Sequence, residues 1–503
     1  MRESNCSKRR KEKEKKSDKE DRLSALPDEA IYHIFSFLDM RQVVKTCLLS
    51  NKWRYLWRST PTLSFDNNDI DCDCPGCGCR RTLCECEPCL SKRAEFRSFV
   101  YNIITLGSSN LVKLQISDYY HVEPARVYEW INAALARRVQ DVDISAYITG
   151  PLVLPLHLFS SNLRALKLRC RATVPNSICA ATWIKHLELT QVVLPDGNTN
   201  GELVLKFSVL ESLRLNDCDV SHLKIICIYT PVLENLDFTR LHIGKSSSCV
   251  VKTCSPNLKF LSVYEYRTRN VLGASVNYYM ENLSSLVSAD ISVRYRGGSD
   301  NELVEECRKF WVKAVCWMCN VQALKLQVSS VQLLLDSPKL LERLPGIFCS
   351  LKHVMLNMYG LKNFHSKEVL KFLERAPHIE TLVLLGHNPS WWTPRESEEE
   401  WTKEKEWAAE DWIPSPLLFN HMVSFEFRNF NGLNVEMKFV EFVLEKAIAL
   451  KKMIIKTKKE WLQGKPYEEI LSFPRASSSV SILFQVTELS ATELDDKRYF
   501  NAM

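Results

Sequence analysis

Residues 111–116 read Leu-Val-Lys-Leu-Gln-Ile, and residues 450–455 read Leu-Lys-Lys-Met-Ile-Ile. Both have the pattern apolar-x-x-apolar-x-apolar, which recurs between them at a mean spacing of about 28 residues. A repeat of this kind cannot bury its apolar edge alone, so neighbouring repeats stack and share one core. The pattern therefore predicts a solenoid whose exposed strand positions form a long binding surface.

The predicted repeat cores usually follow a short turn, such as Ser255-Pro256. They begin at Leu111, Val139, Leu163, Ile184, Leu210, Leu233, Leu258, Leu286, Val321, Leu351, Ile379, Met422 and Leu450. Two are weak, because the Leu286 repeat has Ala289 where a large apolar residue is expected and the Met422 repeat uses phenylalanines. Ordinary amphipathic strands are the alternative, but alternation alone would not produce both the spacing and the preceding turn. We therefore expect a leucine-rich repeat solenoid of the α/β class, with parallel strands on its concave face and helices or irregular segments outside.

The composition favours a single solenoid and argues against other classes of protein. A chain of 503 residues with 46% hydrophobic residues can bury a large core, which fits one elongated solenoid with a small extra module. Of the formal net charge of +6, four charges lie in residues 1–22, which hold ten Lys or Arg and six Asp or Glu. The remainder is nearly neutral, which argues against a basic nucleic-acid surface. The basic tail either addresses the chain to the nucleus or is a solvated leader, and composition leaves both open.

The expected cellular location rests on two signals that the sequence lacks, one for a membrane span and one for secretion. No apolar stretch approaches the roughly 18 residues of a membrane span, and the charged N-terminus lacks the apolar region of a secretory signal. The 19 cysteines are either crowded into one segment or placed on the repeats, where reduced cysteine packs as a small apolar side chain. We expect a protein of the nucleus, the cytoplasm or both, without membrane contact.

A compact helical module precedes the repeats. Residues 26–38 read LPDEAIYHIFSFL, in which proline and two acids precede an apolar helical face. A second helix should carry Val43, Val44 and Leu48 on one face, and Ser50 should cap a third. Residues 47–57 read CLLSNKWRYLW, which supplies the aromatic anchors of that third helix.

These two stretches together resemble a plant F-box over about 40 residues. The resemblance implies a three-helix module that docks on the Skp-family adaptor of a cullin-RING ubiquitin ligase. Carried over by motif, the adaptor contacts would be Leu26, Pro27, Ile34, Leu38, Val43, Val44 and Leu48. We assign Trp53, Leu56 and Trp57 to the core of the module instead.

The resemblance continues along most of the chain. Residues 96–100 (FRSFV) and 139–144 (VQDVDI) are similar to connecting segments of plant F-box proteins with leucine-rich repeats. Residues 430–432 (FNG) and 471–477 (LSFPRAS) are similar to the C-terminal FBD segment of that family. We divide the chain into a disordered basic tail (1–21), an F-box (22–68), a Cys-rich insert loop (69–94), a solenoid (95–420) with a Trp- and Glu-rich insert (388–414), an FBD-like C-terminal repeat and cap (421–490) and a tail (491–503).

Two C-x-x-C pairs in the insert are candidate zinc ligands: Cys74 with Cys77, and Cys86 with Cys89. Four thiolates at such spacing could surround one tetrahedral zinc ion. The gap between the pairs is shorter than in common zinc modules, and three further cysteines make the ligand set ambiguous. Zinc binding and a loop of free thiols both remain open, and no other cofactor is expected.

The function predicted is that of a non-catalytic substrate receptor. Gly244-Lys-Ser246 is a chance match to a phosphate loop, because Thr239 replaces its first glycine, and no hydrolase or metalloprotease motif is present. An unknown protein target would contact strand residues between the inward-facing apolar positions. Our candidates are Lys167, Arg169, Glu188, Arg214, Asn216, Asp237, Tyr264 and Lys325. A non-degradative F-box scaffold is the main alternative, and a zinc-dependent nucleic-acid binder is a weaker one.

Overall fold

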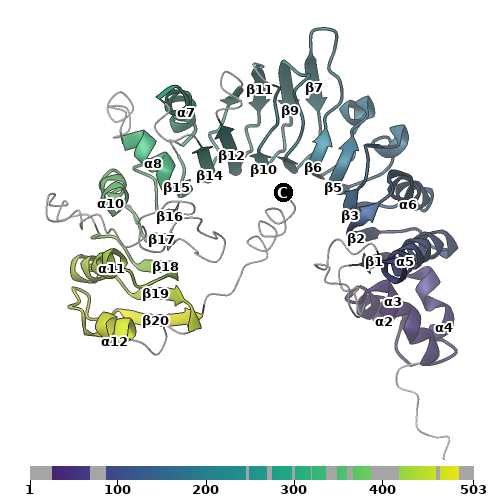
Figure 1. Ribbon diagram of the computed structural model, residues 1–503, viewed down its shortest axis with the longest axis horizontal. Coiled ribbons are helices and arrows are strands. Elements are labelled where there is room, and N and C mark those ends of the chain that lie inside the picture. Colours follow the sequence, from purple (N-terminus) through teal and green to yellow (C-terminus); the bar gives the residue numbers. More distant parts are fainter. Residues whose placement is uncertain are drawn as a thin grey trace, which may run out of the picture. The chain divides into compact units, whose positions relative to one another are not determined.

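A computed structural model describes residues 25–67, 86–244, 248–268, 275–296, 301–318, 320–335, 348–358, 366–386, 419–459 and 465–486. The chain forms two compact units, Met1–Pro195 and Asp196–Met503. Each is a stack of parallel strands with helices on one side, shown by element in Figure 1. In the described residues, no helix has both the length and the apolar character needed to cross a bilayer.

The first unit begins with the short helices α2 (Asp28–Phe35), α3 (Met40–Lys45) and α4 (Trp53–Leu56). Its main sheet has the order β1 (Thr62–Asp66), β2 (Lys113–Val122), β3 (Asp141–Ile148), β5 (Ala165–Thr173) and β6 (His186–Val193). The short strand β4 (Leu152–Val153) pairs with the end of β5. Helices α5 (Glu87–Leu106) and α6 (Pro124–Ala136) both lie on the same side of these strands (Figure 1).

The second unit has two parallel sheets. The long sheet contains β8 (Ser212–Asn216), β10 (Asn235–Thr239), β12 (Phe260–Thr268), β14 (Ser288–Arg296), β15 (Ala323–Gln327), β16 (His353–Asn357), β17 (Thr381–Leu385), β18 (Ser424–Phe430), β19 (Lys452–Thr457) and β20 (Ser481–Val486). The short sheet contains β7 (Glu202–Lys206), β9 (Ile225–Tyr229), β11 (Ser248–Cys254) and β13 (Ser275–Glu281). Helices α7 (Asn301–Ala314), α8 (Val328–Leu335), α10 (Ser366–Glu374), α11 (Asn434–Lys446) and α12 (Lys465–Ser472) join the later strands.

Every predicted repeat start is followed two residues later by a strand of a long sheet, including the weak repeats at Leu286 and Met422. The register aligns the apolar positions of successive repeats, so that Leu213, Leu236 and Leu261 are neighbours. All three are buried at 2% exposure or less. Stacked inward-facing leucines are therefore the core, as the repeat pattern predicts.

Two features differ from the expectation. Strands β7, β9 and β11 form a second layer behind β10 and β12, where we expected helices or irregular segments (Figure 1). These connections contain alternating apolar residues, such as the buried Ile226 and Ile228, which suit a half-buried strand. The second difference is that α5 begins at Glu87, inside the segment assigned to the Cys-rich insert loop, with a proline in its first turn.

Candidate docking surfaces

The three short helices of the N-terminal module surround a small core. Ile31 and Phe35 of α2 are buried, and the ring of Trp53 packs edge-on against Phe35 with centroids 5.6 Å apart. As expected, Trp53 belongs to this core, whereas Leu56 and Trp57 are half-buried. The core residues hold the helices together and leave their outer faces available.

Asp39 connects this module to the first strand. One carboxylate oxygen of Asp39 accepts a hydrogen bond from the Arg41 backbone N–H at 2.8 Å, which caps α3. The other oxygen accepts a hydrogen bond from the Asp66 backbone N–H, also at 2.8 Å. The Arg41 guanidinium donates to the Asp66 carbonyl and lies over the ring of Phe96. The helices are thereby fastened to β1 and α5.

Large apolar side chains are exposed on the module. Leu48 is 86% exposed, Phe37 76% and Tyr55 60%, and Ile34 and Leu49 are also exposed. Single exposed apolar residues are common on protein surfaces, but here five of them lie within residues 34–55 of one short module. We name Ile34, Phe37, Leu48, Leu49 and Tyr55 the module surface. Its members Phe37, Leu49 and Tyr55 were not among our sequence candidates.

The sequence candidates for adaptor contact have different environments. Pro27, Ile34 and Leu48 are exposed, and Leu26, Leu38 and Val44 are half-buried. Val43 is fully buried, so in this chain it supports α3 from within and presents no surface.

Charged candidates on the strands of the first unit form a cluster. The Arg169 guanidinium donates to Glu188 Oε1 at 2.9 Å, and Lys167 Nζ lies 3.8 Å from Glu188 Oε2. Asp143 lies beside Lys167 in the register, and burial raises the pKa of its carboxyl despite the nearby cations. Because opposite charges meet across the strands, these residues largely satisfy one another.

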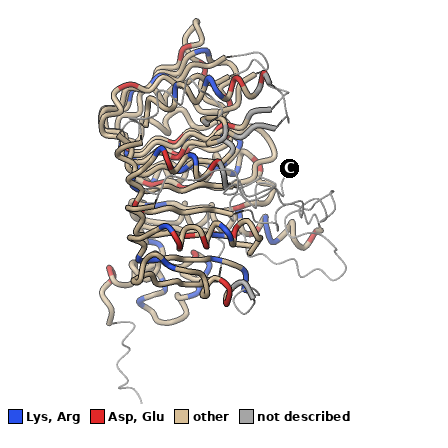
Figure 2. The backbone as a smooth tube through the Cα atoms, turned by 90° about the vertical axis from the view of Figure 1, so that its left-hand side faces the viewer, with Lys and Arg blue, Asp and Glu red and all other residues tan. Residues whose placement is uncertain are grey.

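The second unit repeats this arrangement at the same strand position. Lys325 Nζ lies 2.6 Å from Asp290 Oδ2, and Arg214 Nε lies 4.0 Å from Asp237 Oδ2. Burial raises the pKa of Asp237. Asn216 and Tyr264 are half-buried on the same face. Figure 2 shows that lysine and arginine segments are interleaved with aspartate and glutamate segments along the described backbone.

The same strand position becomes apolar in the later repeats. In the register, Lys325 is followed by Met355, Val383, Glu426, Ile454 and Leu483. These residues are half-buried or exposed on the strand face. We name Met355, Val383, Ile454 and Leu483 the apolar row. Our sequence candidates missed it, although each of these four residues lies between two apolar residues in the sequence.

Glu426 interrupts the apolar row and forms ion pairs with two cationic side chains. Its Oε1 lies 2.9 Å from both Arg428 Nε and Lys456 Nζ. Burial alone would raise the pKa of Glu426, but these hydrogen bonds outweigh it and hold the pKa below its usual range. One carboxylate with two cations leaves a positive charge beside apolar side chains, which suits a partner with apolar and acidic residues.

Only part of the candidate zinc site lies in the described residues. Cys86 precedes the first turn of α5 and Cys89 is buried within that turn, whereas Cys74 and Cys77 lie outside the described residues. Within the described ranges, no three His, Cys, Asp or Glu side chains are grouped as metal ligands. Zinc binding by the insert therefore stays a prediction.

Comparison with known families matches both ends of the chain. The model of the F-box domain family matches residues 23–64, and the model of the FBD family matches residues 416–455. The first match covers the three helices and the module surface. The second covers β18, α11 and the start of β19.

Similar plant proteins cover most of the chain. F-box/LRR-repeat protein 13 of Arabidopsis thaliana is 25% identical over 495 residues, covering 93% of this chain and 97% of the relative. The Arabidopsis F-box/FBD/LRR-repeat protein At5g56420 is 26% identical over 479 residues, covering 92% and 99%. The Arabidopsis F-box/LRR-repeat protein At4g14096 is 28% identical over 374 residues, 73% of each chain. These likenesses confirm the resemblance inferred from residues 26–38 and 47–57.

Proposed function

We propose that this chain, which carries an F-box domain, leucine-rich repeats and an FBD segment, is the substrate-recognition subunit of a Skp-cullin-F-box ubiquitin ligase. The observation that carries the proposal is the module surface, five exposed large apolar side chains within the matched F-box. An apolar groove on a Skp-family adaptor would cover them and bring the chain to a cullin-RING ligase.

The mechanism that we propose is proximity without catalysis by this chain. The ligase would deliver a ubiquitin-charged enzyme, and the solenoid would hold a protein target close to it. Holding two reactants together raises their effective concentration, so the receptor needs no nucleophile or general base of its own.

The apolar row is our preferred target-binding surface. Interface cores favour methionine, arginine and large apolar side chains over paired surface charges. The row has this apolar composition, and beside it Arg428 and Lys456 share the single carboxylate of Glu426. The charged candidates Lys167, Arg169, Glu188 and Lys325 are paired and have no such apolar row beside them. We therefore expect the target to supply apolar and acidic side chains to β16–β20.

Binding of the purified full chain to a plant Skp-family adaptor tests the first step. The change Leu48→Asp introduces a charge at a position that is 86% exposed, so it should abolish adaptor binding while leaving the melting temperature unchanged. The double change Leu26→Ala, Pro27→Ala should weaken binding as well. Isothermal titration calorimetry measures both effects.

The matched control is Leu106→Asp, because Leu106 is an exposed leucine of the same unit outside the F-box match. This variant should bind the adaptor as the wild type does. Failure of the folded wild type to bind any Skp-family adaptor, or equal binding by Leu48→Asp, would contradict the proposed function.

A further inference from the structure

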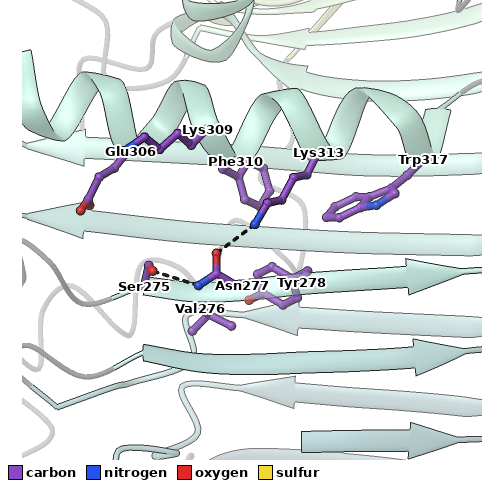
Figure 3. Close-up of a pocket in the computed structure, with 9 residues that line it drawn as sticks. All are labelled: Ser275, Val276, Asn277, Tyr278, Glu306, Lys309, Phe310, Lys313 and Trp317. Carbon is purple, nitrogen blue, oxygen red and sulfur yellow. Dashed lines mark hydrogen bonds between the residues drawn. The ribbon is translucent and has the colours of Figure 1, made fainter. Parts of the chain in front are cut away.

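A cavity of about 160 Å³ lies between β13 and α7, within the second unit. Figure 3 shows Lys313 reaching from the helix toward Asn277 on the strand, with Trp317 beyond it. None of the residues that line the pocket belongs to the F-box module or to the apolar row. Neither the F-box match nor the FBD match includes it.

Helix and strand periodicity bring the lining residues together. Glu306, Lys309 and Lys313 recur at intervals of three or four residues, which places them on one face of α7. Trp317 follows in a short 3₁₀ helix, Val315–Met318, that continues from α7. On β13 the half-buried Ser275 and Asn277 alternate with buried residues. The strand has β11 as its neighbour on one side in the described part of the sheet.

Three aromatic rings form the apolar end of the pocket. The centroid of Tyr278 lies 6.3 Å from Phe310 and 6.5 Å from Trp317, and Phe310 lies 6.0 Å from Trp317. Each pair is nearly perpendicular, with interplanar angles of 84–89°. All three side chains are buried at 8% exposure or less, so they form a preorganised corner suited to a flat apolar group.

The opposite end is rich in hydrogen-bond donors. Lys313 Nζ donates to Asn277 Oδ1 at 3.2 Å, and Asn277 Nδ2 donates to Ser275 Oγ at 3.2 Å. These bonds leave N–H groups on Lys313 and Asn277 and the Ser275 hydroxyl proton for a ligand. Lys309, Lys313 and Glu306 line the pocket, so its cations outnumber its carboxylates. Lys313 Nζ also lies 5.0 Å from the centroid of the Tyr279 ring, and neither lysine forms an ion pair within the described residues. Donors in excess favour an acceptor with negative charge.

We propose that this pocket binds a small organic monoanion with a flat apolar body, of which a single-ring carboxylate is the simplest form. The carboxylate would accept hydrogen bonds from Lys313, Asn277 and Ser275, and its ring would pack into the corner made by Tyr278, Phe310 and Trp317. The cavity volume of about 160 Å³ agrees with a single-ring ligand, because a cavity of roughly 150 Å³ holds one benzene ring.

Benzoate is the probe for this proposal, compared with two molecules that each lack one feature. Benzylamine keeps the ring but is a cation, and acetate keeps the carboxylate but has no ring. Titration of the full chain followed by ligand-observed NMR and calorimetry should give saturable benzoate binding with a Kd of about 1 mM or lower. Benzylamine and acetate should bind at least about tenfold more weakly.

Variants of the lining residues test whether benzoate binds in this pocket. Lys313→Met should weaken benzoate binding at least about tenfold, and Asn277→Asp should abolish it by placing a carboxylate against the ligand. Lys446→Met is the matched control, since Lys446 also lies in the last turn of a helix in this unit and does not line the pocket. No saturation by benzoate up to about 10 mM, or equal binding by benzylamine or by the Lys313→Met variant, would overturn the proposal.

Discussion

Glu436 illustrates how burial changes the chemistry of a single residue. It lies in the first turn of α11 and is 3% exposed. One oxygen of its carboxyl accepts hydrogen bonds from the backbone N–H groups of Asn431 at 2.9 Å and Leu433 at 3.2 Å. Burial raises the pKa of Glu436 to about 7, although these N–H groups oppose the change. The residue closes the turn between β18 and α11 inside the FBD match.

A pH-dependent stability follows from this raised pKa. The usual value of 4.5 applies in the unfolded chain, so between about pH 4.5 and 7 the folded chain holds a proton that the unfolded chain has lost. The stabilisation from Glu436 is therefore complete below about pH 4.5 and is lost as the pH rises through about 7. The loss is on the order of 3 kcal/mol.

The change Glu436→Gln tests this dependence, because glutamine stays neutral at every pH. Between pH 5 and 8 the free energy of unfolding should fall more steeply for the wild type than for the variant, in urea unfolding curves. Glu445→Gln, at an exposed position of the same helix, should follow the wild type. Parallel pH profiles of the wild type and Glu436→Gln would refute the assignment.

Among the elements, β14 departs most from the repeat pattern. Ala289 occupies an inward position where the neighbouring strands have Leu261 and Leu324. It is 1% exposed, and both α7 and α8 pack on β14. The small side chain thus leaves room for the helices behind the strand.

Restoring the repeat pattern at this position should therefore destabilise the protein. Ala289→Leu should lower the free energy of unfolding by about 1–3 kcal/mol, because the added methyl groups have no space. Ala323→Leu, at a half-buried position on the strand face of β15, should have little effect. Chemical denaturation compares the two, and a stabilised Ala289→Leu variant would show that space remains behind β14.

Strand positions were predictable because local sequence determines them. Each apolar-x-x-apolar-x-apolar segment places its own leucines inward, so all the predicted starts are confirmed. Strands β7, β9, β11 and β13 were missed because short alternating segments acquire strand structure only when paired with a neighbour. Their pairing joins residues about 25 apart, as for Ile225 and Val250.

At the scale of the whole molecule, the proposed function needs two surfaces with different roles. The module surface would join the ligase and the apolar row would hold the target. Disrupting either surface should therefore slow the degradation of the same target proteins, which should accumulate. A non-degradative scaffold predicts no such accumulation. This comparison separates degradation from simple binding.

Quantitative proteomics of cells lacking the chain provides the measurement. Re-expressed wild type should restore turnover of the accumulated proteins, whereas Leu48→Asp and the double change Val383→Asp, Ile454→Asp should not. Val287→Asp changes an exposed valine that precedes β14 and should behave as the wild type. Rescue by both disrupted variants would exclude the two-surface mechanism.

The repeat spacing and the F-box motif are enough to predict the fold class and the three-helix F-box module, because both arise from apolar residues at short, regular intervals. The pairing of the charged side chains, in contrast, was not predictable from the sequence. Lys167, Arg169 and Lys325 resemble free binding residues in the sequence, yet each meets an acid from the neighbouring strand. The apolar row and the pocket beside Lys313 likewise depend on which residues the register and packing place together, since interactions between side chains act through space and not along the chain.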